Sequence, residues 1–410
     1  MAYLIFSALG GGIFSIFMLL SVHMLYGNPL YTGIAGFLMA APFVFSLVVG
    51  PIVDRNNKAK ILRYTTFLEF AVLTMLTFTP LLERLGVVFM FVVIFIYSIS
   101  TLFERPAGTA LLPQIVEEDE ILQANSLINI AGLAGGVAIA LVLFSTVDEG
   151  MDLRFIYGVS TIFLAVAFTF ACLLRDPTAK VKAIDAPKHN FMADLVAGMK
   201  FMRGSVLLYL MLALISMRVV MEITATNMPE FAEYHVGVQG YIIFAVVGMI
   251  GGIIASSIIG SVGKKFKVGY IIATFMVLRG ISRVAFVYVL PQHYHGGLAL
   301  LLLFAALSSC VGIVYTSLEQ KMPPKSMVGR VDTLTTTCFS IMAAVGALLG
   351  GVVGRLVNNV DSIFIFQGYM YVAVGVLIVL IPTVRRMPHL DDIVRAEEDE
   401  YYVPQETPHK

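Results

Sequence analysis

The feature of this sequence that most constrains its fold is a series of apolar blocks, each twenty or more residues long. Two examples are AYLIFSALGGGIFSIFMLLSVHMLY near the start of the chain and LALLLLFAALSSCVGIVYTSL in its second half. A block of this length crosses about 30 Å of hydrocarbon as an α-helix. Inside a membrane, a continuous apolar block can satisfy its backbone hydrogen bonds only as a helix. The blocks therefore predict an all-α integral membrane protein.

The composition excludes a soluble protein. Of the 410 residues, 58% are hydrophobic and 13% are charged, and the mean hydropathy is +0.88, whereas about a quarter of the residues in soluble domains are charged. Cys172, Cys310 and Cys338 all fall inside apolar blocks, which predicts small buried side chains rather than disulfides or a metal site.

The sequence also lacks the motifs of several enzyme classes. It has no phosphate-cradling loop and no motif for covalent catalysis, which argues against an ATP-driven pump and against an enzyme. We expect no cofactor, no metal and no nucleic-acid partner.

The apolar blocks and the breakers between them predict twelve membrane-spanning helices. Their ranges are 3–26, 30–50, 61–81, 86–110, 120–146, 153–174, 205–229, 239–262, 268–290, 297–318, 330–355 and 362–384. The long polar stretch between the sixth and seventh spans predicts two six-helix bundles, 1–175 and 205–386, joined by a cytoplasmic linker, 176–204. A polar cytoplasmic tail, 387–410, follows.

The distribution of lysine and arginine predicts the orientation of the chain. With both termini in the cytoplasm, the inner connections and the two ends hold 20 of the 27 basic residues. The outer connections hold only Arg84, Arg154 and Arg355. Four more lie within or at the edge of spans: Arg105, Arg218, Arg279 and Arg283. This asymmetry follows the positive-inside rule.

The two predicted halves resemble each other. GPIVDRNNKAKIL after the second span has a counterpart in GSVGKKFKVGYI after the eighth. ALLPQIVEEDEILQANSL, between the fourth and fifth spans, corresponds to SLEQKMPPKSMVGRVDTL between the tenth and eleventh. A parallel repeat of six helices is typical of one large group of transporters.

One short turn carries the strongest local signal. Gly50, Asp54, Arg55 and Lys58 lie together after the second span, where a glycine permits close helix approach and opposite charges can pair across helix ends. GPIVDRNNKAK resembles the loop signature of the major facilitator superfamily, in which this loop helps to latch the outward-open state. Asn57 stands where many members of that family have glycine.

The resemblance extends over nearly the whole chain. RPAGTALLPQIVEEDEILQANSL, NMPEFAEYHVGVQGYIIFAVVGMIGG and QKMPPKSMVGRV are similar to stretches of the drug-exporter branch that includes macrolide and enterobactin efflux proteins. That grouping implies proton-driven export by alternating access, with the first, fourth, seventh and tenth spans lining the cavity. The antiporter signature normally has a proline beside the glycines of the fifth span, and the glycines Gly132, Gly135 and Gly136 have none, so antiport cannot be inferred from that helix.

Charged residues inside spans are the best candidates for function, because a charge at the bilayer centre costs about 3 kcal/mol or more unless it faces a cavity or a partner. Arg218 and Glu222 are four residues apart in the seventh span, so they share one helix face. Glu222 is a candidate for proton coupling or for binding a cationic substrate. The alternative is a static ion pair with Arg218.

Two further acidic residues could titrate during transport. Glu69 lies in the third span and Glu104 lies late in the fourth. Glu104 could instead belong to a charge cluster with Arg105 and the basic cytoplasmic turns. In the second half, Arg330 and Asp332 lie at the start of the eleventh span, and we expect them to form the gate cluster of that half.

Arg279 and Arg283 are again four residues apart, near the middle of the ninth span. They could pair with an acidic residue such as Glu222, or bind an anionic substrate or a lipid phosphate. By contrast, His235, His293 and His295 fall in predicted outer loops, and without a carboxylate at a defined spacing we interpret them as solvated rather than as metal ligands.

The sequence thus predicts a secondary transporter, a monomer in the plasma (inner) membrane, that moves a hydrophobic or amphipathic small molecule by alternating access with a proton as the coupling ion. Two alternatives remain open at this stage: a facilitator that imports a metabolite or moves lipid, and a membrane receptor that keeps the fold without transporting.

Overall fold

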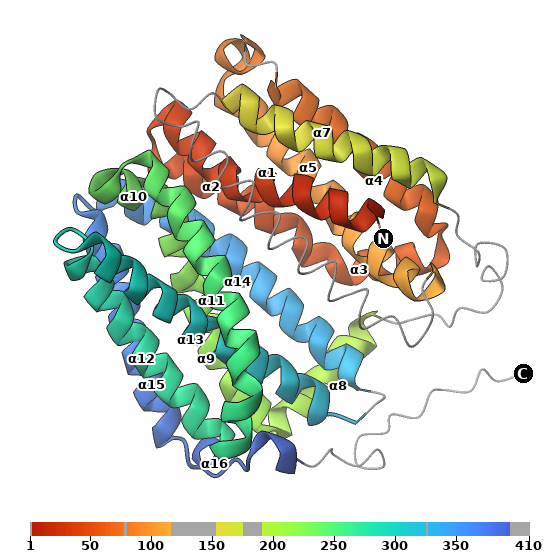
Figure 1. Cartoon of the computed structure of the whole chain (residues 1–410). Coiled ribbons are helices and arrows are strands. Elements are labelled where there is room, and N and C mark those ends of the chain that lie inside the picture. Colours follow the sequence, from red (N-terminus) through yellow and green to blue (C-terminus); the bar gives the residue numbers. More distant parts are fainter. Residues whose placement is uncertain (1, 78–79, 116–152, 175–190, 325–326, 394–410) are drawn as a thin grey trace, which may run out of the picture. The chain divides into compact units, whose positions relative to one another are not determined.

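The structure is a computed structural model that describes residues 2–77, 80–115, 153–174, 191–324 and 327–393, and these residues form helices and short connections (Figure 1). The helices are α1 (Ala2–Tyr26), α2 (Pro29–Ala40), the 3₁₀ helix η1 (Ala41–Phe45), α3 (Ser46–Arg55), α4 (Lys58–Thr77), α5 (Pro80–Ile115), α7 (Leu153–Leu173), α8 (Phe191–Gly204), α9 (Val206–Thr226), α10 (Met228–Val236), α11 (Val238–Lys265), α12 (Val268–Val289), α13 (Tyr294–Lys321), α14 (Val328–Leu356), α15 (Val360–Leu380), α16 (Pro382–Arg385) and the 3₁₀ helix η3 (Leu390–Asp392).

Nine helices in the described ranges are long and apolar enough to cross a membrane, which confirms the all-α membrane fold. They are α1, residues 86–112 of α5, α7, α9, residues 238–263 of α11, α12, α13, α14 and α15. The predicted second span corresponds to α2, η1 and α3, and the predicted third span to α4, which carries Lys58, Lys60, Arg63 and Glu69. The predicted fifth span, 120–146, lies outside the described residues.

Local chemistry explains three of the breaks in the helices or between them. Pro42 has no backbone N–H to donate, and it lies in the 3₁₀ turn that separates α2 from α3. Gly86 has a φ of 68° and interrupts α5 where the predicted fourth span begins. Gly237, with a φ of 83°, ends the short helix α10, which lies between α9 and α11. Positive φ values at these two points favour glycine.

The helices pack into two compact units. The first comprises Met1–Lys188, Met221–Met249 and Ser340–Ile363, and the second comprises His189–Val220, Ile250–Phe339 and Phe364–Lys410. Because α9, α11, α14 and α15 contribute residues to both, these packing units differ from the two halves predicted along the chain. The predicted division into two six-helix halves therefore stays a prediction.

In the first unit, α1 packs on α7 and α4 packs on α5 and α7. Two buried hydroxyl groups join α1 to α7: Tyr157 Oη donates to Ser21 Oγ (2.7 Å), and Ser160 Oγ donates to the carbonyl oxygen of Gly10 (2.7 Å). Tyr157 belongs to an apolar cluster that also includes Phe14, Phe17 and Leu73. The polar groups are thus satisfied inside an apolar bundle, as a membrane interior requires.

The end of this unit opposite the N-terminus contains segments from α2 and α14 that approach closely. A Cβ atom added to Gly33 would lie 2.6 Å from Gly351 Cα, and one added to Gly351 would lie 2.9 Å from Gly33 Cα. Close by, Asn227 Nδ2 donates to the carbonyl oxygen of Gly350 (2.9 Å). Small residues are what permit two membrane helices to pack this closely.

In the second unit, α12 packs against α13 and against α15. A Cβ atom added to Gly375 of α15 would lie 2.9 Å from the carbonyl oxygen of Ala273 in α12. The core of the unit is apolar and includes Ile272, Met276, Val314, Leu318 and Tyr371. Because α12 packs in this way, the side of the helix that carries Arg279 and Arg283 is buried in the unit.

Candidate functional site

Two carboxyl groups meet inside the first unit. Glu69 of α4 is 1% exposed, and its carboxyl group lies close enough to that of Glu104 in α5 for the two to interact. Thr101 Oγ1 donates a hydrogen bond to Glu69 Oε1 (3.2 Å). Two neighbouring carboxylates repel each other, and a proton on one of them relieves that repulsion. The arrangement can hold one exchangeable proton.

Hydroxyl groups from α1 orient Glu104. Tyr3 Oη donates to Glu104 Oε1 (2.5 Å), and Ser7 Oγ donates to the same oxygen. Tyr3 Oη also lies 3.1 Å from Thr66 Oγ1 of α4. Hydrogen bonds donated to a carboxylate favour its charged form. Of the two carboxyl groups, Glu104 accepts two hydroxyl hydrogen bonds from α1, whereas Glu69 is buried and accepts one from Thr101.

Arg105 does not share this network. Its side chain is exposed, and its guanidinium lies 5.4 Å from the centre of the Phe43 ring. No ion pair joins it to Glu104 in the part of the chain that the structure describes.

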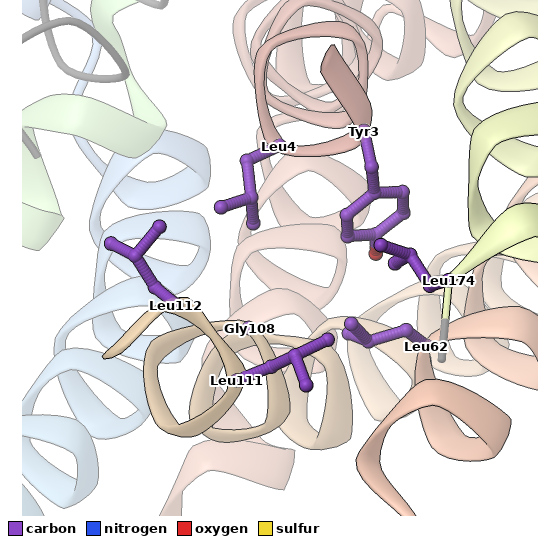
Figure 2. A pocket seen from close by; sticks show the side chains of 7 residues that line it. All are labelled: Tyr3, Leu4, Leu62, Gly108, Leu111, Leu112 and Leu174. Atoms are coloured by element: carbon purple, nitrogen blue, oxygen red, sulfur yellow. The ribbon is translucent and has the colours of Figure 1, made fainter. Parts of the chain in front are cut away.

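A small apolar pocket has Tyr3 in its lining (Figure 2). Its empty volume, including its mouth, is about 220 Å³. Its lining residues come from α1, α4, α5 and the end of α7: Tyr3, Leu4, Leu62, Gly108, Leu111, Leu112 and Leu174. Tyr3 both lines the pocket and binds Glu104, so one side chain connects an apolar surface with the carboxyl pair.

The charged turn predicted to act as a gate joins α3 to α4. Gly50, Asp54 and Arg55 lie in α3, and Lys58 begins α4. Arg55 is exposed and Lys58 is 2% exposed. A Cβ atom added to Gly50 would meet no described atom within 4 Å, so the close approach expected at this glycine is not seen in this conformation.

Asn57 stands where many members of the family have glycine, and its hydrogen bond explains this difference. Its Oδ1 accepts a hydrogen bond from the backbone N–H of Lys60 (2.9 Å), which is the contact that an N-cap side chain makes at the start of a helix. Asparagine at this position thus caps α4.

The second predicted gate cluster lies at the start of α14. Arg330 is half-buried and Asp332 is exposed. Gly198 of α8 packs against the backbone of Arg330, since a Cβ atom added to Gly198 would lie 3.1 Å from the Arg330 carbonyl oxygen.

Four other predicted residues lie as follows. Arg218 and Glu222 are both half-buried in α9, and their pairing stays a prediction. Arg279, like Arg283, is buried in α12.

Sequence reasoning missed the polar contacts made by α10. His23 Nε2 of α1 lies 2.7 Å from Glu233 Oε2, and His235 Nε2 lies 2.6 Å from Asp361 Oδ1 at the start of α15. From the sequence, His235 was interpreted as a solvated histidine of an outer loop, because no carboxylate lies at a defined spacing from it. The carboxylate is Asp361, 126 residues further along the chain.

Sequence reasoning also missed Glu319, which is 5% exposed in α13. The sequence places it one residue beyond the predicted tenth span, so it was counted as a residue of the cytoplasmic connection.

Comparison with known proteins identifies relatives of this chain. The family model described as Major Facilitator Superfamily matches residues 1–347. Macrolide efflux protein A of Streptococcus pyogenes is 24% identical over 378 residues, which cover 88% of this chain and 89% of that protein. Enterobactin exporter EntS of Escherichia coli is 23% identical over 354 residues, which cover 83% and 80%.

Solved transporter structures share the fold. The nucleoside transporter NupG superposes with a TM-score of 0.71 at 14% identity, covering 92% of this chain and 98% of that one. A POT family transporter in complex with a thioalcohol-conjugated peptide gives a TM-score of 0.71 at 11% identity, covering 94% and 96%. These two likenesses establish the fold alone.

Proposed function

Because this chain belongs to the Major Facilitator Superfamily, and is thus a multi-pass membrane transporter rather than an enzyme, we propose that it exports hydrophobic or amphipathic small molecules in exchange for protons. The direction and the class of cargo are supported by the two relatives, whose names describe a macrolide efflux protein and an enterobactin exporter. The coupling ion is supported by the carboxyl pair.

The Glu69–Glu104 pair is the observation that carries the proposal. Two neighbouring carboxyl groups inside a helix bundle repel each other strongly when both are charged, so we expect the pair to retain a proton. Loss of that proton adds a second negative charge inside the bundle, which α1, α4 and α5 must accommodate by moving apart or by admitting a cation. Proton binding and helix packing are thereby coupled.

The adjoining pocket supports an apolar cargo. Leucines make up most of its lining, and drug-sized sites are mostly apolar with a few polar groups.

The charged turns complete the mechanism. Two charged turns hold one state of the alternating-access cycle until the binding of cargo or a proton shifts the equilibrium between the states. One turn consists of Gly50, Asp54, Arg55 and Lys58, and the other contains Arg330 and Asp332. Glu222 with Arg218 in α9 is the second candidate for coupling. We place the transporter in the plasma membrane with both termini in the cytoplasm.

The test is flux in proteoliposomes with an imposed pH gradient and a macrolide as the probe. We expect proton-driven export by the parent protein and at least a tenfold loss of pH-dependent flux in Glu69→Gln and Glu104→Gln. The exposed Asp392 provides the control, since Asp392→Asn should retain full activity. If both glutamine variants keep the full pH-dependent flux, the carboxyl pair is not the coupling site.

The same assay separates the alternatives. Flux of the probe that ignores the pH gradient would identify a facilitator. No flux of any probe, together with probe binding, would identify a receptor with the transporter fold. A normal flux lost only in Glu222→Gln would move the coupling site to α9.

A further inference from the structure

Two arginines on one face of α12 are almost completely buried. Arg279 is 5% exposed and Arg283 is 2% exposed. They are four residues apart, so their side chains lie on the same face of the helix. The opposite side of α12 carries the exposed residues Leu278 and Ile281. The two guanidinium groups therefore point into the second unit.

Aromatic rings surround both guanidinium groups. The Arg279 guanidinium carbon lies 3.6 Å from the centre of the Tyr371 ring, and that of Arg283 lies 4.6 Å from the centre of the Phe304 ring. Four rings from α12, α13 and α15 form this arginine cage: Phe286, Phe304, Phe364 and Tyr371. The faces of aromatic rings attract cations, but they carry no net charge.

The hydrogen-bonding capacity of the two arginines is mostly unused. Arg283 Nε donates to Gln367 Oε1 (2.6 Å). Arg279 Nε and Arg283 Nη1 are buried atoms without a hydrogen-bond partner. No carboxylate forms an ion pair with Arg279 or Arg283 within the described ranges of the chain.

Among the described residues, this arrangement provides no negative charge for the two arginines. An arginine stays protonated in proteins, and burying an ion without a counter-charge costs far more than cation–π contacts restore. The two charges also repel each other across one turn of helix. The acidic partner that the sequence suggested for these arginines is therefore absent from the described residues. A bound anion would supply the missing negative charge.

We propose that the arginine cage of α12 is a binding site for a small anionic group taken up from solution, an inorganic anion or the carboxylate of a solute. Guanidinium groups bind such groups with paired, charge-assisted hydrogen bonds, and the surrounding rings can hold an attached apolar chain. The proposal does not depend on proton coupling or on the direction of transport.

The depth of the cage favours a solute over a lipid head group. Arg279 is the twelfth residue of the 22-residue α12, so it lies about 16 Å from the start of the helix at a rise of about 1.5 Å per residue. Lipid phosphates lie at the surfaces of a hydrocarbon core about 30 Å thick, which is near the ends of this helix.

Thermal unfolding of the purified protein in detergent tests the proposal. Cys310 is 1% exposed and reacts with a thiol-specific fluorogenic dye when the protein unfolds, and the Cys172→Ser background removes the exposed thiol. Chloride, phosphate or octanoate replaces gluconate at constant ionic strength, and octanamide serves as the uncharged match for octanoate.

We expect at least one of these anions to raise the melting temperature saturably, as binding to the folded state requires, whereas octanamide does not. The rise should disappear in Arg283→Gln and persist in Arg355→Gln, which removes an exposed arginine of α14. An effect of chloride and phosphate would identify an inorganic anion, and an effect of octanoate alone would identify a carboxylate solute.

Two outcomes would overturn the proposal. One is a melting temperature of the parent protein that no anion raises above its value in gluconate, a result that does not require any variant to fold. The other is a rise that only micelles containing phosphatidylglycerol produce, since this would assign the anion to lipid.

Discussion

Tyr3 connects the two parts of the candidate site. Its ring lines the apolar pocket, and its hydroxyl group donates to Glu104. A cargo molecule that displaces the ring would also remove a hydrogen bond from the carboxylate. At the scale of single residues, this side chain is therefore the simplest link between cargo and proton.

Tyr3→Phe should shift the pH dependence of transport without abolishing it. A hydrogen bond to a charged group contributes about 1.5–3 kcal/mol, and about 1.4 kcal/mol corresponds to one pH unit. The midpoint of the pH–flux profile should therefore move by about one to two pH units relative to the parent protein. Proteoliposome flux between pH 5 and 9 measures the midpoint.

Tyr209→Phe is the matched control, because Tyr209 is 49% exposed in α9. An unchanged midpoint in Tyr3→Phe would show that the hydroxyl group does not influence proton binding.

The sequence identified Glu69 and Glu104 because each is an acidic residue within an apolar block. It could not predict that they touch, since this depends on how α4 packs against α5. Tyr3 and Ser7 gave no signal, because tyrosine and serine near the start of a span are ordinary. The contact between α1 and Glu104 links residues about 100 positions apart, and only the fold brings them together.

At the scale of helices, the contact between α2 and α14 depends on two glycines. Gly33 and Gly351 face each other so closely that an added Cβ atom on either would contact the backbone of the other. Backbone atoms cannot turn away as a side chain can. A larger residue must therefore separate the two helices.

Gly33→Val should lower the thermal stability of the purified protein, since overpacking costs about 1–3 kcal/mol. Gly248→Val is the control, because a Cβ atom added at Gly248 would meet no described atom within 4 Å. The thiol-dye assay measures both midpoints. Equal midpoints for the two variants would contradict the importance of the glycine contact.

The docking of α10 should depend on pH through Glu230. Burial raises the pKa of the Glu230 carboxyl group, Glu233 raises it further, and His23 opposes the shift. The docked helix thus holds a proton that the undocked helix releases, so docking is strongest at acidic pH and weakens as the pH rises through the raised pKa.

Hydrogen–deuterium exchange of residues 228–236, corrected for the intrinsic effect of pH, should show less protection at higher pH. Glu230→Gln should flatten this dependence, whereas Asp392→Asn should leave it unchanged. A parent protein whose corrected protection does not change with pH would rule out this role of Glu230.

At the scale of the whole molecule, hydrophobicity predicted the membrane fold well, because the length of an apolar block measures the thickness that it crosses. It predicted continuous helices at 30–50 and 205–229, where the structure has α2, η1 and α3, and then α9 followed by α10. Pro42 accounts for the break within 30–50, and the break within 205–229 falls at Asn227, which precedes α10. Hydropathy averaged along a whole apolar block does not detect a break of a single helical turn within it.

The orientation of the chain is the remaining prediction at this scale. A fluorescent protein that matures only in the cytoplasm, fused after Lys410, should be bright, because basic residues concentrate in the connections assigned to the cytoplasm. A fusion inserted after Gln292, in the connection between α12 and α13, should be dark. A dark C-terminal fusion would reverse the topology.

The position of α10 has a consequence for inhibiting this transporter. One nine-residue helix holds both His23 of α1 and Asp361 of α15, and it lies between two membrane spans rather than inside one. Its Tyr234 is 73% exposed. An antibody fragment that binds α10 would therefore restrain two transmembrane helices at once. Such a fragment could stop the transport cycle without entering the membrane or competing with the cargo.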